Sequence, residues 1–281
     1  MDNKFINKDS HSSKVYLITG SSLGIGFDIL SRLSKEGATV ILTSRRESNL
    51  KKAEERLVNL GIKNYCKITC NFNNKDERTK LFKLIEDKYN KLDGLVLNIA
   101  VNPYFGDMLK INEKEMIKIF NVNLFNTFLT IKESLPLLLK NSNYIQYMSN
   151  DMNLDNLNNK ISIDNKSPHP SILIISSQAA FTPFDKIGMY SISKTALVSL
   201  TKILAKELVH FNCRINCIAP GIIKTRFASA ILSSELANSN FMKRVGDSNE
   251  IVGLASYLLS EDASFITGET ISINGGLNGR F

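Results

Sequence analysis

The fold is decided by residues 15–26, which read VYLITGSSLGIG. The apolar run Val15–Ile18 predicts a buried strand, and apolar residues at helical spacing follow the glycines. Gly20, Gly24 and Gly26 are spaced G-x-x-x-G-x-G. Glycines allow a sharp turn and let a backbone approach a phosphate without a Cβ in the way, and the free N–H groups of the next helix can bind a pyrophosphate. The segment therefore predicts a dinucleotide-binding turn, with a ligand-free glycine-rich loop as the alternative.

Strand-like and helix-like segments alternate along the chain. Strands are expected near residues 15–19, 39–43, 65–69, 94–98, 171–176, 214–218 and 270–273. Amphipathic helices are expected between them, including Leu50–Leu60, Glu77–Tyr89 and Glu113–Lys140. This βαβ alternation predicts a Rossmann fold, the α/β class in which helices cover a doubly wound parallel sheet. With 281 residues the chain is long enough for one such domain.

The predicted domain covers residues 14–281 and follows a flexible polar tail over residues 1–13. It is interrupted at 141–170, where eight asparagines and little periodicity predict a low-complexity insertion. The insertion enters at the amino-terminal edge of the next strand, whereas active sites in such sheets lie at the carboxyl ends. We therefore expect a mobile surface loop away from the site, with a partner-docking loop as the alternative.

The net charge of +8 raises the question of a nucleic-acid partner. The basic residues are scattered, with no arginine-rich run and no aromatic interleaving, which favours a solvated lysine-rich surface. No apolar stretch approaches the ~20 residues that span a bilayer, so no membrane span is expected. Residues 1–12 lack the apolar core of a secretory signal, which predicts a reducing compartment.

The four cysteines occur as Cys66-x-x-x-Cys70 and Cys213-x-x-x-Cys217, both in strand-like segments. Residues four apart in a strand are separated by about 13 Å, which is too far for a disulfide within either pair. The spacing also differs from that of C-x-x-C zinc sites. We expect buried free thiols and no metal, and the three histidines fall in no motif.

Three residues late in the chain carry a chemical pattern. Tyr190 and Lys194 are spaced i and i+4 and therefore share one face of a helix. An ammonium beside a phenol stabilises the phenolate and lowers the phenol pKa. The Ser177 hydroxyl can polarise a carbonyl held against that tyrosine. Y-x-x-x-K alone is unspecific, and its weight comes from the glycine-rich turn at the other end of the chain.

In order and spacing, TGSSLGIG, Ser177, Tyr190-x-x-x-Lys194 and Pro220-Gly221 resemble the motifs of the short-chain dehydrogenase/reductases. The resemblance covers nearly the whole chain. Two further stretches, AVNPYFG at 100–106 and SEDASFITGET at 260–270, are similar to the NADP-dependent carbonyl and retinal reductase branch. The resemblance implies an oxidoreductase that transfers hydride between NADP(H) and a small-molecule ketone or aldehyde.

The end of the second strand indicates which cofactor is bound. In dinucleotide folds an acidic residue here hydrogen-bonds the ribose hydroxyls of NAD. This chain instead has Ser44, followed by Arg45 and Arg46. A guanidinium can bind a 2′-phosphate bidentately. We therefore expect NADP(H), with Arg45 the main phosphate ligand and Arg46 the second, against the alternative that both are solvated.

The resemblance implies the rest of the cofactor site. Asn71 takes the place of an adenine-contacting aspartate, and Thr225 matches the residue that holds the nicotinamide carboxamide. Asn98 belongs to a family N-N-A-G pattern that reads L-N-I-A here, so Ile99 and Ala100 replace smaller residues. The other cofactor contacts implied are Gly20, Ser22, Gly24, Ile25, Gly26, Tyr190, Lys194, Pro220, Gly221 and Ile223.

The resemblance also implies catalytic roles. Ser177 and Tyr190 hydrogen-bond the substrate carbonyl, and Tyr190 acts as general acid. Lys194 lowers the tyrosine pKa and holds the nicotinamide ribose. Asn123 matches the asparagine that supports a water relay to the lysine, with Asn121 as the nearby alternative. Apolar side chains within residues 226–245 predict a cover for a lipophilic or aromatic substrate.

Three functions remain open. NADPH-dependent carbonyl reduction leads. A 3-oxoacyl-[acyl-carrier-protein] reductase of fatty-acid synthesis would use the same catalytic residues, and a basic surface would suit an acidic carrier protein. The third is a weakly catalytic NADP-binding protein that acts through the insertion. Relatives usually form tetramers through helices corresponding to Glu113–Lys140 and Tyr190–Phe211, which implies a homo-oligomer. The terminal residues 278–281 depart from a peroxisomal S-K-L signal, so the cytoplasm is expected first and the peroxisome second.

Overall fold

The computed structural model describes residues 10–140, 142–149, 169–182, 184–225, 227 and 239–277. In this part of the chain, parallel strands form one seven-stranded sheet in the order β3-β2-β1-β4-β5-β6-β7. The strands are β1 (Val15–Ile18), β2 (Thr39–Ser44), β3 (Tyr65–Thr69), β4 (Gly94–Leu97), β5 (Ser171–Ile175), β6 (Arg214–Pro220) and β7 (Thr270–Ile273). The strand order reverses between β1 and β4, which is where ligands bind in doubly wound sheets. The predicted Rossmann fold is confirmed.

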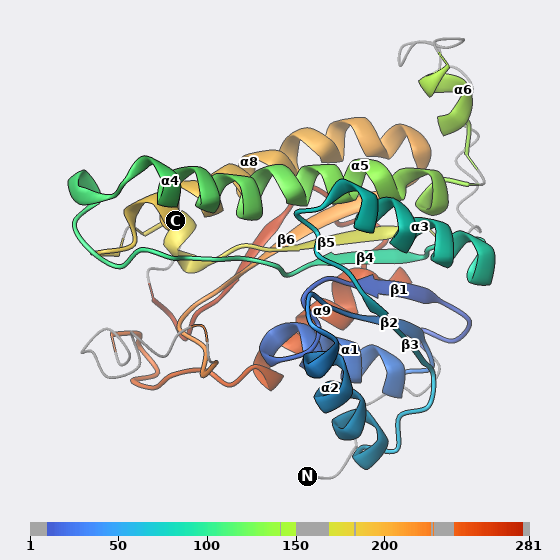
Figure 1. Cartoon of the computed structure of the whole chain (residues 1–281), viewed down its shortest axis with the longest axis horizontal. Coiled ribbons are helices and arrows are strands. Elements are labelled where there is room, and N and C mark those ends of the chain that lie inside the picture. The colour runs from blue at the N-terminus through green and yellow to red at the C-terminus, as the bar shows by residue number, and fades with distance from the viewer. Residues whose placement is uncertain are drawn as a thin grey trace.

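Helices cover both faces of the sheet, as Figure 1 shows. One face carries α1 (Gly24–Lys35), α2 (Glu47–Asn59) and α9 (Asn249–Leu259). The other carries α3 (Lys75–Tyr89), α4 (Glu113–Phe120), α5 (Asn126–Leu138) and α8 (Gly188–Leu208). Alternate strand side chains supply the two cores. Leu17 of β1 packs in one hydrophobic cluster and its neighbour Ile18 in the other.

The single helix expected over Glu113–Lys140 is divided into three parts. A π-helical segment at Asn121–Phe125 joins α4 to α5, and Pro136 lies within the last turn of α5. An inserted π turn shifts the hydrogen-bond register and re-aims the side chains within it, and such segments are frequent at functional sites. The apolar period that predicts a helix is nearly the same for both geometries, so the sequence does not reveal the change.

The N-terminal segment packs further upstream than predicted. His11 is buried, and its Nδ1 lies 2.7 Å from the Tyr16 hydroxyl oxygen. Its Nε2 lies 3.2 Å from the hydroxyl oxygen of Ser256, which donates to Glu36 at 2.6 Å. The folded domain therefore includes His11, which corrects the predicted boundary at residue 14. Residues 1–9 of the predicted tail lie outside the described residues.

The first part of the predicted insertion forms the short helix α6 (Tyr144–Met148). The Tyr144 and Tyr147 rings contact Phe211, with centroids 5.4 and 5.6 Å apart. Figure 1 places α6 beyond the C-terminal end of α8. Residues 150–168 lie outside the described residues, and the expectations for them stay predictions.

Two further expectations concern thiols and membranes. Cys70, Cys213 and Cys217 are buried free thiols, whereas Cys66 is only half-buried. Burial raises the pKa of the Cys213 thiol to about 12, which keeps it protonated and unreactive. Among the described residues, no helix combines the length and the apolar character needed to cross a bilayer.

Candidate active site

A cavity of about 890 Å³ opens where the strands end at their carboxyl edge. It gathers residues that the sequence predicts from positions far apart in the chain. Those that line it are Gly20, Ser22, Gly24, Ile25, Ser44, Arg45, Asn71, Asn98, Ala100, Ser177, Tyr190, Lys194, Pro220, Gly221, Ile223 and Thr225. Gly26, Arg46 and Asn123 were also predicted site residues, but they do not line it. Gly26 and Asn123 are buried next to lining residues, and Arg46 is exposed at the start of α2.

The glycine-rich turn between β1 and α1 has the backbone that its sequence predicts. Gly20 and Gly24 have φ values of +62° and +58°, in the left-handed region that glycine adopts without strain. A Cβ on Gly26 would lie 2.5 Å from the side-chain nitrogen (Nδ2) of Asn98 and 2.7 Å from the Gly20 carbonyl oxygen. Those two atoms already form a hydrogen bond of 3.1 Å. The turn is therefore locked to the end of β4, and Gly26 provides the room for that bond.

The end of β2 carries no carboxylate. Ser44 is buried there, and its hydroxyl oxygen lies 3.5 Å from that of Ser22 in the glycine-rich turn. Arg45 is exposed and lines the cavity next to Ser44. Asn49 from α2 lines the same end of the cavity and was not predicted. This corner therefore presents hydroxyl, amide and guanidinium donors to a ligand.

Tyr190 and Lys194 lie on the first turns of α8, and Ser177 follows β5. The Lys194 ammonium lies 5.6 Å from the centre of the Tyr190 ring and donates a 2.8 Å hydrogen bond to the carbonyl oxygen of Ile175. Ser177 lines the same cavity, and its hydroxyl lowers the pKa of Tyr190. The spacing that suggested one helix face thus brings all three side chains to one wall of the cavity.

Burial controls the charge of these groups. It raises the pKa of Tyr190 to about 12, and the Ser177 hydrogen bond acts in the opposite direction. It lowers the pKa of Lys194 to about 8, with nearby Cys217 opposing the shift. The sequence predicts a lowered tyrosine pKa because of the lysine. In the structure the loss of hydration dominates and the Ser177 hydroxyl is the opposing influence, so Tyr190 is a protonated phenol near neutral pH.

Asn123 lies in the π-helical segment and is fully buried. Its side-chain oxygen accepts a 2.8 Å hydrogen bond from the Val101 amide, and its side-chain nitrogen donates to the Val101 carbonyl at 3.1 Å. The same nitrogen donates at 3.0 Å to the Ser193 hydroxyl, which donates to the Tyr190 carbonyl at 2.7 Å. Asn123 therefore fixes the loop after β4 and the turn of α8 that carries Tyr190. Its side chain is not exposed to the cavity.

Sequence comparisons agree with this arrangement. The family model described as short chain dehydrogenase matches residues 14–145, and the one described as Enoyl-(Acyl carrier protein) reductase matches 159–278. The protein named dehydrogenase/reductase SDR family member 4 of Mus musculus is 36% identical over 96% of this chain and 88% of its own. The chain belongs to the short-chain dehydrogenase/reductase family. Tropinone reductase-like 3 of Erythroxylum coca, 34% identical over 95% of this chain and 94% of its own, is also similar.

Solved structures support the fold of this short-chain dehydrogenase/reductase. A short-chain type dehydrogenase/reductase from Mycobacterium marinum superposes with a TM-score of 0.82 at 24% identity, covering 98% of each chain. One from Mycobacterium ulcerans gives 0.80 at 24% identity, over 94% of this chain and 90% of that one. Members of this family bind a nicotinamide cofactor, and the glycine-rich turn lies where such a cofactor binds in a Rossmann fold.

Several side chains on the Tyr190 side of the short-chain dehydrogenase/reductase cavity are aromatic. Phe105, Phe184 and Phe227 line it, and the Phe227 ring lies 5.6 Å from that of Tyr190. Tyr104 does not line the cavity, and its hydroxyl donates a 2.9 Å hydrogen bond to the Asp107 carbonyl. In the segment predicted to cover the substrate, residues 226 and 228–238 lie outside the described residues. The described part of the chain holds no group of residues able to bind a metal ion.

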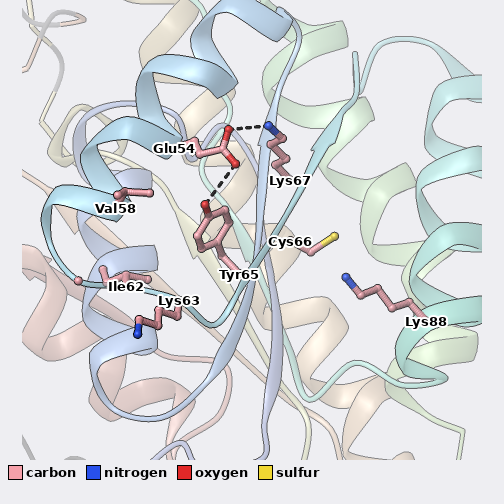
Figure 2. A pocket seen from close by; sticks show the side chains of 9 residues that line it. Glu54, Val58, Ile62, Lys63, Tyr65, Cys66, Lys67 and Lys88 are labelled. Atoms are coloured by element: carbon pink, nitrogen blue, oxygen red, sulfur yellow. Dashed lines mark hydrogen bonds and ion pairs between the residues drawn. The ribbon is translucent and has the colours of Figure 1, made fainter.

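A second hollow, of about 660 Å³, lies on the outer edge of β3 (Figure 2). Its only carboxylate among the described residues, Glu54, accepts hydrogen bonds from Tyr65 at 3.2 Å and from Lys67 at 2.5 Å. Lys63, which precedes β3, and Lys88, on α3, also line this hollow. The two hollows share no lining residue. The one acidic group lining this hollow is already hydrogen-bonded to Tyr65 and Lys67, so the described lining supplies no catalytic constellation.

Proposed function

We propose that this short-chain dehydrogenase/reductase is an NADPH-dependent carbonyl reductase acting on ketones or aldehydes. The observation that carries the proposal is one cavity lined by the glycine-rich turn at one end and by Ser177, Tyr190 and Lys194 at the other. A ligand in this cavity would reach both the phosphate-binding turn and a protonated phenol. Carbonyl reduction needs that combination.

The residues present fit a nicotinamide dinucleotide with a 2′-phosphate. The left-handed Gly20 and Gly24 leave the turn without side chains where a pyrophosphate would lie. At the end of β2, Ser44 leaves space, and Arg45 offers a bidentate donor in place of a carboxylate that would repel a phosphate. Asn71 and Thr225 line the adenine and nicotinamide ends implied by the family resemblance. Arg46 remains the second candidate for the phosphate.

When bound, the cofactor supplies the hydride. The chain's own residues then bind and protonate the carbonyl oxygen. Ser177 donates a hydrogen bond that polarises the carbonyl, and Tyr190 transfers its phenol proton to the developing alkoxide. With a pKa of about 12, Tyr190 holds this proton at neutral pH and is still more acidic than an alcohol. Tyr190 is therefore in the protonation state that a general acid for carbonyl reduction requires.

Lys194 and Asn123 act around the tyrosine. The ammonium stabilises the phenolate left after proton transfer, and its charge is retained below a pKa of about 8. Asn123 holds Val101 and Ser193, and through them the position of Tyr190 on α8. Its backbone carbonyl accepts the Thr127 hydroxyl at 2.8 Å, and the proposed water relay to Lys194 would begin near this carbonyl.

Aromatic side chains near Tyr190 favour a lipophilic or aromatic carbonyl substrate. The second candidate is 3-oxoacyl-thioester reduction, which is compatible with the match of residues 159–278 to the family model described as Enoyl-(Acyl carrier protein) reductase, since both involve a carrier-bound acyl group. The non-catalytic alternative rests on the insertion, and deleting residues 145–166 would test it. Unchanged turnover together with unchanged partner binding would exclude it.

We also propose a homo-oligomer, with the tetramer expected from the family. Ile117, Phe125 and Phe128 are each at least 40% exposed along α4, the π-helical segment and α5. Ile192 and Ile203 are similarly exposed on α8. Exposed apolar side chains on neighbouring helices are typical of a subunit interface.

A cytoplasmic location stays the expectation from the sequence.

The test is steady-state oxidation of NADPH and of NADH with an aromatic ketone and dicarbonyl panel, and with an acetoacetyl thioester. We expect NADPH-dependent ketone turnover that falls by roughly 10²–10⁴-fold in Tyr190→Phe, the range for losing a general acid. Arg45→Ala should weaken NADPH binding about 10-fold or more and leave NADH binding unchanged, because a charge-assisted hydrogen bond contributes about 1.5–3 kcal/mol. Preference for the thioester would favour fatty-acid synthesis, and no turnover with any substrate would refute the reductase.

A further inference from the structure

Lys186 lies at the mouth of the cavity, on the short loop that leads into α8. Its Nζ is 5.9 Å from the centre of the Phe105 ring, within reach of a cation–π contact. Its backbone carbonyl accepts a 2.9 Å hydrogen bond from the Gly106 amide. These contacts connect the loop after β4 to the loop before α8, and they place an ammonium group at the rim of the site.

The position belongs to the reacting end of the cavity. The neighbouring Ile187 is buried and packs with Ala179 and Tyr190 in one apolar cluster. The phosphate-binding residues Ser22 and Arg45 come from the opposite half of the sheet, at the ends of β1 and β2. A group bound by Lys186 would therefore belong to the substrate, not to the cofactor's 2′-phosphate.

The Lys186 charge is available for a ligand. Among the described residues no carboxylate lies within ion-pair distance of its ammonium. Asp185 also lines the cavity and is the acidic residue nearest to it in the chain. Lys186 has a φ of +66°, a conformation that costs a non-glycine residue about 1 kcal/mol or more.

We propose that Lys186 determines specificity by binding a carboxylate carried by the carbonyl substrate at a distance from the reacting carbon. The proposal rests on the proposed carbonyl reduction. Phe105, Phe184 and Phe227 contribute the apolar surface on which the substrate body would lie. The substrate class is thus an aromatic or apolar ketone or aldehyde that bears a carboxylate. Because the ammonium does not touch the reacting atoms, it contributes equally to the ground state and to the transition state.

The test compares two isosteric ketones, 4-acetylbenzoate and 4-acetylbenzamide, in the full-length protein with NADPH. The quantity measured is the ratio of their kcat/KM values. Lys186→Asn removes the charge with a residue that tolerates left-handed backbone. We expect the ratio to fall roughly 5-fold, the size of a partly exposed ion pair of about 1 kcal/mol. The loss should appear in KM for the acid with kcat unchanged, as for uniform binding.

Two variants complete the design. Lys186→Arg keeps the charge and should restore the ratio, while Lys63→Asn removes a lysine at the remote β3 edge and should leave it unchanged. An unchanged ratio in Lys186→Asn, or a fall of the same size in Lys63→Asn, would overturn the proposal.

Binding measured by calorimetry on the Tyr190→Phe protein with NADPH separates this inference from the function itself. If the parent protein turns over neither ketone, but the acid binds more tightly than the amide and loses this advantage in Lys186→Asn, the proposed reductase fails and the charge recognition stands. If both ketones are reduced with no dependence on Lys186, the reductase stands and the charge recognition fails. Equal calorimetric binding of acid and amide also overturns the recognition.

Discussion

Gly26→Ala should damage this protein far more than one methyl group normally does. The added Cβ would lie 2.5 Å from the side-chain nitrogen (Nδ2) of Asn98 and 2.7 Å from the Gly20 carbonyl oxygen. These two atoms are hydrogen-bonded to each other. Forcing a methyl group into such a space typically costs about 1–3 kcal/mol. Losing the bond adds about 1 kcal/mol. We expect the free energy of unfolding to fall by about 2–4 kcal/mol.

Gly253→Ala is the matched control. Gly253 also lies within a helix, α9, but it is exposed and its added Cβ would meet no atom within 4 Å. Alanine loses less backbone entropy than glycine when a helix forms, so this variant should be about 0.5–1 kcal/mol more stable than the parent. The same substitution is thus expected to lower the free energy of unfolding at one helical glycine and to raise it at the other.

Urea denaturation measures the free energy of unfolding of both variants, and fluorescence titration with NADPH measures their affinity for the cofactor. Because Asn98 holds the turn that is proposed to contact the pyrophosphate, Gly26→Ala should also weaken NADPH binding at least 10-fold, or about 1.4 kcal/mol. Gly253→Ala should bind NADPH like the parent. If Gly26→Ala unfolds at the parent's urea concentration and binds NADPH normally, the locked turn has no energetic role and the reasoning is refuted.

Three further predictions concern protons and assembly. The kcat/KM for ketone reduction should fall as the pH rises past about 8, where Lys194 loses its charge, while Tyr190 stays protonated; a profile flat to pH 10 would contradict this. Burial lowers the pKa of His11 below its ordinary 6.5, so the unfolded state binds more protons below pH 6.5. The free energy of unfolding, measured with urea, should therefore decline as the pH falls from 6.5 to 5, and it should decline less in His11→Gln than in the parent. An equal decline in the two proteins would remove His11 as the cause. Phe125→Glu should produce smaller particles in light scattering than Val58→Glu, which changes an even more exposed apolar residue on α2; equal masses would exclude the interface.

The sequence predicts the sheet well because its signals are local. All seven expected strands lie within two residues of the observed ones, since each is a short apolar run between turn residues. The π-helical segment escapes prediction because its apolar period is nearly that of an α-helix. The contacts of Asn123 with Val101 and of His11 with Ser256 escape prediction because they join residues far apart in the chain. No periodicity reports such contacts.

At the site, residue type and spacing predict which side chains meet, whereas their protonation depends on the environment. Spacing alone places Tyr190 and Lys194 side by side, and the structure agrees. Spacing alone also suggests that the ammonium lowers the phenol pKa, yet burial removes water from both groups and raises the pKa of Tyr190 to about 12. Burial also lowers the pKa of Lys194 to about 8, so the same loss of hydration keeps the phenol protonated and makes the ammonium easier to discharge. A phenol that keeps its proton cannot act as a base at neutral pH, but it can donate to an alkoxide. The protonation state of Tyr190 therefore follows from the packing around it and not from the Y-x-x-x-K motif.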